Sequence, residues 1–198
     1  MQIPGAAGEL EAMFTEPSES TSLSTVLCHP HPQYGGSMHD AVLASCEAAL
    51  LAHGSACLRF NFRGVGASAG RYDNGEGELE DVQSAVAWLR TTHPDHTLWV
   101  LGYSFGASMV YNSLVNDLLF PTPQRAILIA PPVGMMSFDG NLPDGCQLSV
   151  VAGTADEFID QQKLTAWPAA DVHLLDGVDH FFGGAHQALT ETVRKILQ

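Results

Sequence analysis

Short apolar segments alternate with segments of helical periodicity along most of this chain. Seven segments rich in apolar and β-branched residues predict strands, and they cover residues 9–16, 24–29, 55–61, 97–102, 125–130, 147–152 and 171–176. Five further segments predict helices at residues 38–52, 76–92, 105–117, 157–166 and 184–197. The pattern is therefore one of strands separated by helices.

The segment 76–92 has the clearest helical pattern. Val82, Val86 and Leu89 fall on one face at helical spacing. Three glutamates lie in its first turn, where the helix dipole favours negative charge. We expect these glutamates to be stabilised by that dipole.

Strands that are separated by helices pair in parallel, because a parallel neighbour requires a crossover connection. Segments such as RAILIA and LSVVAG are almost wholly apolar, which is typical of strands covered by helices on both faces. The sequence therefore predicts an α/β fold with an open, mostly parallel sheet of about seven strands. We expect residues 1–198 to form a single domain, since this length suits one core. Ligands of such sheets bind beyond the carboxyl ends of the strands.

The composition excludes several classes of partner. The formal net charge is −14 and the isoelectric point is near 4.7, so the surface would repel a nucleic-acid backbone. No apolar run has the length of a membrane span. The N-terminal segment MQIPGAAGEL lacks the basic start and long apolar stretch of a signal peptide. These features favour a cytoplasmic protein with neither a nucleic-acid nor a membrane partner.

Four cysteines are scattered without a CxxC pair, at positions 28, 46, 57 and 146. We interpret them as reduced, buried side chains. The histidine-rich segment CHPHPQYGGSMHD contains no recognised metal-ligand spacing, and we interpret His29 as a packing residue of its loop. The segment RGVGASAG does not match the G-x-G-x-x-G fingerprint, and no helix follows it directly. We therefore expect no metal and no organic cofactor.

A G-x-S-x-G motif spans residues 102–106, between a predicted strand and a predicted helix. Such a turn projects a serine hydroxyl at the tip of the sheet, and its glycines allow neighbouring elements to approach closely. The alternative is a serine that merely caps the helix. We predict that Ser104 is a nucleophile.

A serine nucleophile requires a base that takes its proton. Among nine histidines, His180 lies just beyond the last predicted strand and ahead of the last helix. His173 is expected inside a strand and His186 inside a helix. We predict that His180 is the base.

The histidine in turn requires an acid that fixes its tautomer. Asp156 follows the penultimate predicted strand, and its alternative role is to cap the helix at 157–166. Asp176, Glu157 and Asp179 are weaker candidates for the acid. The order Ser104, Asp156, His180 along the chain is the order found in α/β hydrolases.

The chain resembles a bacterial group of small serine hydrolases of the α/β-hydrolase fold, related to dienelactone hydrolases and acyl-peptidase-like enzymes. The similarity extends over roughly residues 10–197 and is carried by the segments LCHPHPQYGGSMHD, RFNFRGVGASAGRYDNGEGELEDV, LGYSFGA, AGTADEF and VDHFF. It implies a catalytic triad of Ser104, Asp156 and His180. It also implies that Arg63 supports the site, and we expect its side chain to bond neighbouring carbonyls.

Acyl transfer also requires donors for the oxyanion of the tetrahedral intermediate. One is expected to be the backbone N–H of Phe105, the residue after the nucleophile. The resemblance implies that the other is the backbone N–H of His31, with Gln33 as second choice. Pro30 and Pro32 are excluded because proline has no N–H.

Many α/β hydrolases carry a helical cap after the strand that corresponds to RAILIA. Here the short segment PPVGMMSFDGNLPDG leads directly to the next strand, so we expect no cap domain and an open site. An apolar rim for the substrate is expected from four residues, although core packing is their alternative role: Tyr34, Met135, Met136 and Phe138.

Three functional hypotheses follow. The first is a serine hydrolase that cleaves small-molecule carboxylic esters or thioesters with short acyl groups, or with bulk that stays outside the site. The second is a peptidase or lactone hydrolase using the same three residues. The third is a non-catalytic binding protein on the hydrolase scaffold. The sequence leaves the oligomeric state open between a monomer and a homodimer.

Overall fold

The computed structural model describes residues 1–19, 21–167 and 170–198. The strands are β1 (Gln2–Ile3), β2 (Leu10–Thr15), β3 (Leu23–Cys28), β4 (Ala56–Phe60), β5 (Thr97–Tyr103), β6 (Arg125–Ile129), β7 (Gln147–Gly153) and β8 (Ala170–Leu175). The helices are α1 (Ala41–Ala52), α2 (Gly77–Thr92), α3 (Phe105–Val115), α4 (Gln161–Thr165) and α5 (His186–Ile196), with a short 3₁₀ helix, η1, at Pro32–Tyr34.

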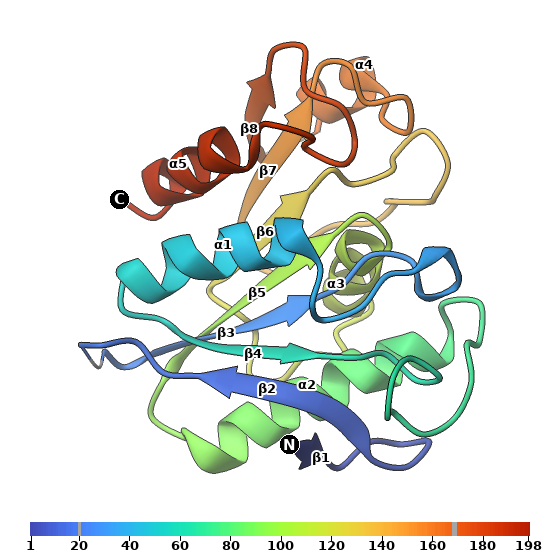
Figure 1. Cartoon of the computed structure of the whole chain (residues 1–198), viewed down its shortest axis with the longest axis vertical. Coiled ribbons are helices and arrows are strands. Elements are labelled where there is room, and N and C mark those ends of the chain that lie inside the picture. The colour runs from blue at the N-terminus through green and yellow to red at the C-terminus, as the bar shows by residue number, and fades with distance from the viewer. Residues whose placement is uncertain (20, 168–169) are drawn as a thin grey trace.

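All eight strands form one sheet in the order β1-β2-β4-β3-β5-β6-β7-β8 (Figure 1). From β4 to β8, every neighbouring pair is parallel. β2 runs antiparallel to both β1 and β4. The predicted open and mostly parallel α/β sheet is confirmed, with eight strands in place of about seven.

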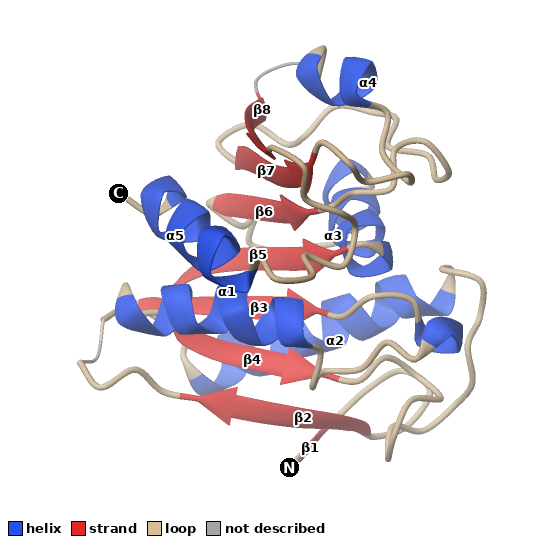
Figure 2. Cartoon of the chain, turned by 45° about the horizontal axis from the view of Figure 1, so that its top comes forward, coloured by secondary structure: helices blue, strands red, loops and turns tan. Residues whose placement is uncertain are grey.

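Helices cover both faces of the sheet (Figure 2). On one face α1 and α5 pack over a core that includes Leu27, Leu101 and Ile129. On the other face α2 and α3 pack over a core that includes Val26, Val100 and Leu128. The inner strand β3 is buried along its whole length, because consecutive side chains point to opposite faces and each face meets a helix layer.

Two elements differ from the expectation. β1 has only two residues, which is too short for a periodic pattern to reveal. The helix expected at 157–166 was wrong in its start: α4 begins at Gln161, and the Asp160 carboxylate accepts hydrogen bonds from the backbone N–H groups of Gln162 and Lys163. A cap at Asp160 begins the helix there, so residues 157–159 remain in a loop.

The carboxyl ends of the parallel strands lie at one edge of the sheet (Figure 2). This edge brings together the loops that follow β3, β4, β5, β6, β7 and β8. The connection from β6 to β7, residues 130–146, contains no helix and no strand, so nothing like a cap domain is inserted there. No helix in the described part of the chain is long and apolar enough to cross a membrane.

Candidate active site at the carboxyl edge of the sheet

Ser104 lies on the sharp turn between β5 and α3, with φ of 54° and ψ of −116°. A residue other than glycine rarely adopts this backbone conformation, which costs about 1–3 kcal/mol. Both flanking glycines are required by close approach, since a Cβ at Gly102 would collide with the backbone of Gly106 and a Cβ at Gly106 with the carbonyl of Cys28. The turn is therefore held by tight packing between β3, β5 and α3.

The alternative role of Ser104 as a helix cap is not realised. Ser104 occupies the cap position of α3, but its side chain makes no capping hydrogen bond. The hydroxyl instead lies 2.9 Å from Nε2 of His180. Its only described partner is thus an imidazole that is 76 residues away in the sequence.

A continuous chain of hydrogen bonds links Ser104, His180 and Asp156. Nδ1 of His180 lies 2.7 Å from Oδ2 of Asp156. The side chain of Asp156 is fully buried and that of His180 is 8% exposed. A buried carboxylate at Nδ1 favours the tautomer in which Nε2 is free to accept the serine proton.

Further contacts hold both partners in place. Oδ1 of Asp156 accepts a hydrogen bond of 2.8 Å from the backbone N–H of Phe158. Asp156 therefore orders its own loop and does not cap α4, which corrects its alternative role. The carbonyl of His180 accepts a hydrogen bond from the hydroxyl of Tyr103, at 3.1 Å.

The rival residues have other partners. The Asp176 carboxylate accepts from the hydroxyl of Thr154, and the Asp179 carboxylate accepts from the backbone N–H groups of Phe181 and Gly183. His186 lies in α5, as expected, with Nδ1 at 3.2 Å from the hydroxyl of Ser45. Asp156 is thus the carboxylate that contacts His180.

Of the two residues expected to stabilise an oxyanion, one begins α3 and the other packs against it from the loop after β3. Phe105 is the first residue of α3, and the first N–H groups of a helix have no partner within it. His31 precedes η1, and its ring centroid lies 5.0 Å from that of Phe105. The loop after β3 is therefore packed against the turn that carries Ser104.

Tyr72 contacts this loop and was not found from the sequence. Nδ1 of His31 accepts a hydrogen bond from the backbone N–H of Gln33, which leaves the proton on Nε2. That proton is directed at the hydroxyl of Tyr72, 3.2 Å away. Burial lowers the pKa of His31, although the Glu78 carboxylate acts in the opposite direction, and a lowered pKa favours the neutral ring that this arrangement needs.

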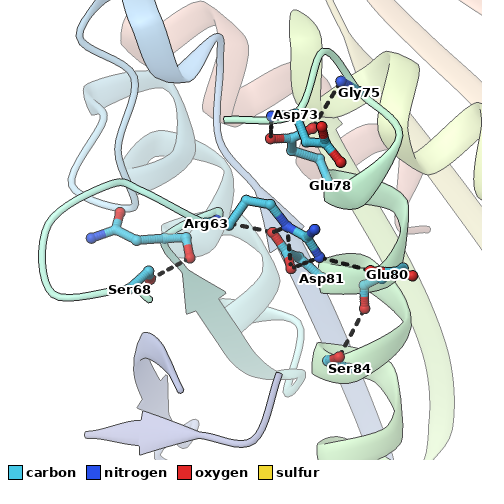
Figure 3. A network of polar contacts seen from close by, with 9 residues as sticks. Arg63, Ser68, Asp73, Gly75, Glu78, Glu80, Asp81 and Ser84 are labelled. Atoms are coloured by element: carbon cyan, nitrogen blue, oxygen red, sulfur yellow. Dashed lines mark hydrogen bonds and ion pairs between the residues drawn. The ribbon is translucent and has the colours of Figure 1, made fainter. Parts of the chain in front are cut away.

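Buried charges at the start of α2 hold the segment that carries Tyr72 (Figure 3). The buried Glu78 carboxylate accepts hydrogen bonds of 2.8 Å from the backbone N–H groups of Asp73 and Gly75. The expected stabilisation by the helix dipole is thus only part of the role of Glu78. Its carboxylate mainly fixes the loop that precedes the helix.

The same network contains Arg63, whose expected bonds to carbonyls were wrong. Its guanidinium forms a bidentate pair with the fully buried Asp81 and also contacts Glu80 (Figure 3). Burial disfavours the charge of Arg63, but the hydrogen bonds to Asp81 and Glu80 outweigh it and raise the pKa. A buried guanidinium needs carboxylate partners more than carbonyls, and α2 supplies them.

We expect the Tyr72→Phe variant to lower kcat by about five- to tenfold with little change in KM. In the wild type the hydrogen bond between Tyr72 and His31 would orient the His31 loop without touching the substrate. Its loss costs about 1 kcal/mol. Tyr111→Phe is the matched control, because it removes a tyrosine hydroxyl that bonds the carbonyl of Gly140 at 3.0 Å. Steady-state kinetics on one ester would decide, and a change in KM alone would contradict the prediction.

His29 packs within its loop, as interpreted from the sequence. It is buried, its Nε2 accepts a hydrogen bond of 3.0 Å from the backbone N–H of Phe62, and its Nδ1 donates to the carbonyl of Pro30. The bond at Nε2 requires the neutral ring, because a protonated imidazole has no acceptor nitrogen, whereas the bond from Nδ1 would persist in either form. Burial lowers the pKa of His29 to about 4.

This histidine makes the fold sensitive to acid. Its contribution is complete above the unfolded pKa of about 6.5 and is lost as the pH falls towards 4, because only the unfolded state then takes up the proton. Between a pH above about 6.5 and a pH of about 4, we expect the free energy of unfolding to fall by about 3 kcal/mol more in the wild type than in His29→Gln. The glutamine amide oxygen can still accept the hydrogen bond from the backbone N–H of Phe62. Urea titrations at several pH values would measure the difference, and parallel curves would refute it.

The four residues expected to form an apolar rim divide into two groups. Tyr34 and Met135 are strongly exposed, on the loops after β3 and β6. Met136 and Phe138 are half-buried and pack against the core. The ring of Phe138 contacts those of Tyr111 and Trp167, so Phe138 belongs to the packing around α3.

Two phenylalanines beside His180 were also missed. The rings of Phe158 and Phe181 lie 4.6 Å and 5.4 Å from the imidazole, both edge to face. Each follows a predicted site residue closely, in the segments DEF and DHFF. Their closeness in sequence to the candidate acid and base was the signal that could have identified them as site residues.

Comparisons with known proteins show the family of this chain. A family model described as serine aminopeptidase, S33, matches residues 26–166. An uncharacterized protein of Rickettsia prowazekii is 28% identical over 192 residues, which cover 90% of this chain and 79% of that protein.

Two solved structures are similar over almost the whole chain. A serine hydrolase without lid from Xanthomonas campestris is 33% identical, with a TM-score of 0.88 and coverage of 98% of this chain and 91% of that one. A serine hydrolase homologue from Coxiella burnetii is 32% identical, with a TM-score of 0.90 and coverage of 100% and 96%. The sequence-based resemblance is thereby confirmed, and the chain belongs to the lidless serine hydrolases of the α/β-hydrolase fold.

Proposed function

We propose that this protein hydrolyses carboxylic esters of small molecules, with Ser104 as nucleophile, His180 as base and Asp156 as the acid that orients the histidine. The observation that carries the proposal is the unbroken chain of hydrogen bonds from the Ser104 hydroxyl through His180 to the buried Asp156. A serine hydroxyl is a weak nucleophile without such a base. A binding protein would have no need for all three groups in this arrangement.

The reaction would proceed in two halves. Oγ of Ser104 forms a bond to the ester carbonyl carbon while its proton passes to Nε2 of His180. The bond from that carbon to the alcohol oxygen then breaks, and the imidazolium returns the proton to the departing oxygen. In the second half a water molecule, deprotonated by His180, attacks the acyl-enzyme and releases the acid.

The backbone N–H groups of Phe105 and His31 would donate to the oxyanion. Each donor of this kind contributes about 10²–10³-fold in rate. The packing of the His31 ring against Phe105 supports this assignment, because it ties the two backbone segments together. The hydrogen bond from His31 to Tyr72 restrains the same loop.

The missing lid bears on the choice of substrate. The connection 130–146 contains no helical cap, and a site without a cap shields a long acyl chain poorly from water. Short acyl groups, or substrates with bulk outside the site, therefore suit it best. Thioesters are compatible with the same chemistry.

A peptidase is the second candidate, because the matching family model is described as a serine aminopeptidase. The same three residues can cleave amides when the leaving amine is protonated by the histidine. Parallel assays with an ester and the corresponding anilide would separate the two activities. A higher kcat/KM for the anilide would favour the peptidase.

A fluorophosphonate probe followed by peptide mapping tests the proposal directly. The probe should label the folded protein at Ser104 and abolish hydrolysis of p-nitrophenyl acetate. Among p-nitrophenyl esters of increasing acyl length, kcat/KM should be highest for short chains. Folded protein that resists labelling and leaves every ester intact would support a non-catalytic role instead.

A further inference from the structure

Phe181 is a large apolar side chain that stands in water beside the candidate base. It is 65% exposed, and its ring meets the imidazole of His180 at an interplanar angle of 89°. The backbone N–H of Phe181 is fixed by the Asp179 carboxylate at 3.1 Å. Because this exposed ring lies against the candidate base, a substrate bound at His180 would come close to it.

Phe158, which is half-buried, is a second aromatic side chain that contacts the imidazole, from the loop after β7. Its ring lies 4.6 Å from His180, and its N–H is bound by Asp156. The carbonyl of Phe158 accepts a hydrogen bond of 3.1 Å from the backbone N–H of Gly134, which places the exposed Met135 next in the chain. We refer to Phe158 and Phe181 as the aromatic wall.

The chemistry of the proposed reaction decides which part of a substrate would meet this wall. Nε2 of His180 must return its proton to the oxygen of the departing alcohol, so that oxygen has to lie within hydrogen-bond reach of the imidazole. The carbonyl oxygen must point instead to the start of α3 and the His31 loop. The alcohol part of the ester would thus lie beside the imidazole, against which both rings of the aromatic wall pack.

The charges around the wall restrict the alcohol further. The loops 153–160 and 176–185 contain five carboxylates and neither lysine nor arginine. An anionic leaving group, such as one that carries phosphates, would be repelled by this field. An uncharged aromatic group would gain the apolar contact without that penalty.

We infer that the aromatic wall is the leaving-group subsite and selects esters of uncharged aromatic alcohols. Phe181 is its main contact and Phe158 supports it. This inference rests on the proposed esterase function and adds the identity of the alcohol side. It concerns specificity and leaves the roles of Ser104, His180 and Asp156 unchanged.

Two isomeric esters test the inference. Benzyl acetate carries its phenyl ring on the alcohol side, and methyl phenylacetate carries it on the acyl side. Phe181→Ala should lower kcat/KM for benzyl acetate about five- to tenfold more than for methyl phenylacetate, as expected for the loss of one ring contact. The intrinsic reactivity of each ester cancels when the variant is compared with the wild type.

Phe120→Ala is the matched control, because Phe120 is 88% exposed in the loop that follows α3. This control variant should leave unchanged the ratio of kcat/KM for benzyl acetate to kcat/KM for methyl phenylacetate. A third substrate, 4-carboxybenzyl acetate, should react more slowly than benzyl acetate, and the difference should shrink as salt screens the carboxylates.

The outcomes separate the inference from the function on which it rests. If Phe181→Ala hydrolysed both esters with the wild-type ratio of kcat/KM, or lost more kcat/KM on methyl phenylacetate, the leaving-group subsite would be wrong. The proposed esterase function would be unaffected by either result. A wild type that hydrolyses neither ester and resists the fluorophosphonate would overturn both. If Phe181→Ala changed the oligomeric state and not the ratio, Phe181 would belong to a contact between two copies.

Discussion

Ser104→Ala is expected to lower kcat for p-nitrophenyl acetate by at least about 10³-fold. Alanine removes the attacking oxygen, and no other hydroxyl is described within hydrogen-bond reach of His180 Nε2. The fold should persist, because alanine fits the same space and the backbone strain at position 104 is the same for both residues. Initial rates and a urea titration would measure both properties.

Ser113→Ala is a suitable control for this experiment. Ser113 lies on α3, the helix that follows Ser104; it is fully buried, and its hydroxyl has no hydrogen-bond partner in the described structure. Removing it should cost neither activity nor stability. A Ser104→Ala protein that retained a tenth or so of the wild-type rate would mean that another residue attacks the ester.

Asp156→Asn is expected to lower kcat by about 10³–10⁴-fold with little change in KM. The asparagine amide can donate to Nδ1 of His180, which moves the ring proton to Nε2. That nitrogen can then no longer accept the proton of Ser104. The amide oxygen can still accept from the backbone N–H of Phe158, so the loop should keep its conformation.

Asp176→Asn provides the comparison. Asp176 is an exposed carboxylate on the loop that precedes His180, and it bonds Thr154. Its neutralisation changes the charge near the site without changing the tautomer of His180, and we expect kcat within about twofold of the wild type. Equal losses in both variants would show that general electrostatics, and not the tautomer, explains the effect.

Much of the fold could be predicted because burial dictates its pattern. Strands such as β6 and β7 are covered on both faces, so their sequences are almost wholly apolar. Helix α2 exposes one face and shows its periodicity clearly. The start of α4 could not be predicted in the same way, because both Asp156 and Asp160 are plausible caps and only the contact of Asp156 with His180 excludes the first.

The candidate site residues could be predicted from their order along the chain, whereas the loop contacts that hold the site in place could not. Ser104 and His180 follow strands whose ends meet at one edge, which sequence order alone suggests. Glu78 looked like a residue that complements the helix dipole, yet its carboxylate binds the backbone of a loop that has no regular pattern. Tyr72 and Phe181 gain their positions from such loops, so no periodicity identifies them.

The connection between β6 and β7 also indicates how this scaffold could be elaborated. Phe138 and Gly140 anchor its first half to Tyr111, while residues 141–145 bridge to β7 without forming any regular element. That bridge leads into the start of β7, at the edge of the sheet opposite Ser104. A helical hairpin inserted near Gly134 instead, whose N–H bonds the carbonyl of Phe158, would lie beside His180 and leave the sheet untouched. A capped enzyme and this lidless one would then differ by a single insertion in one loop.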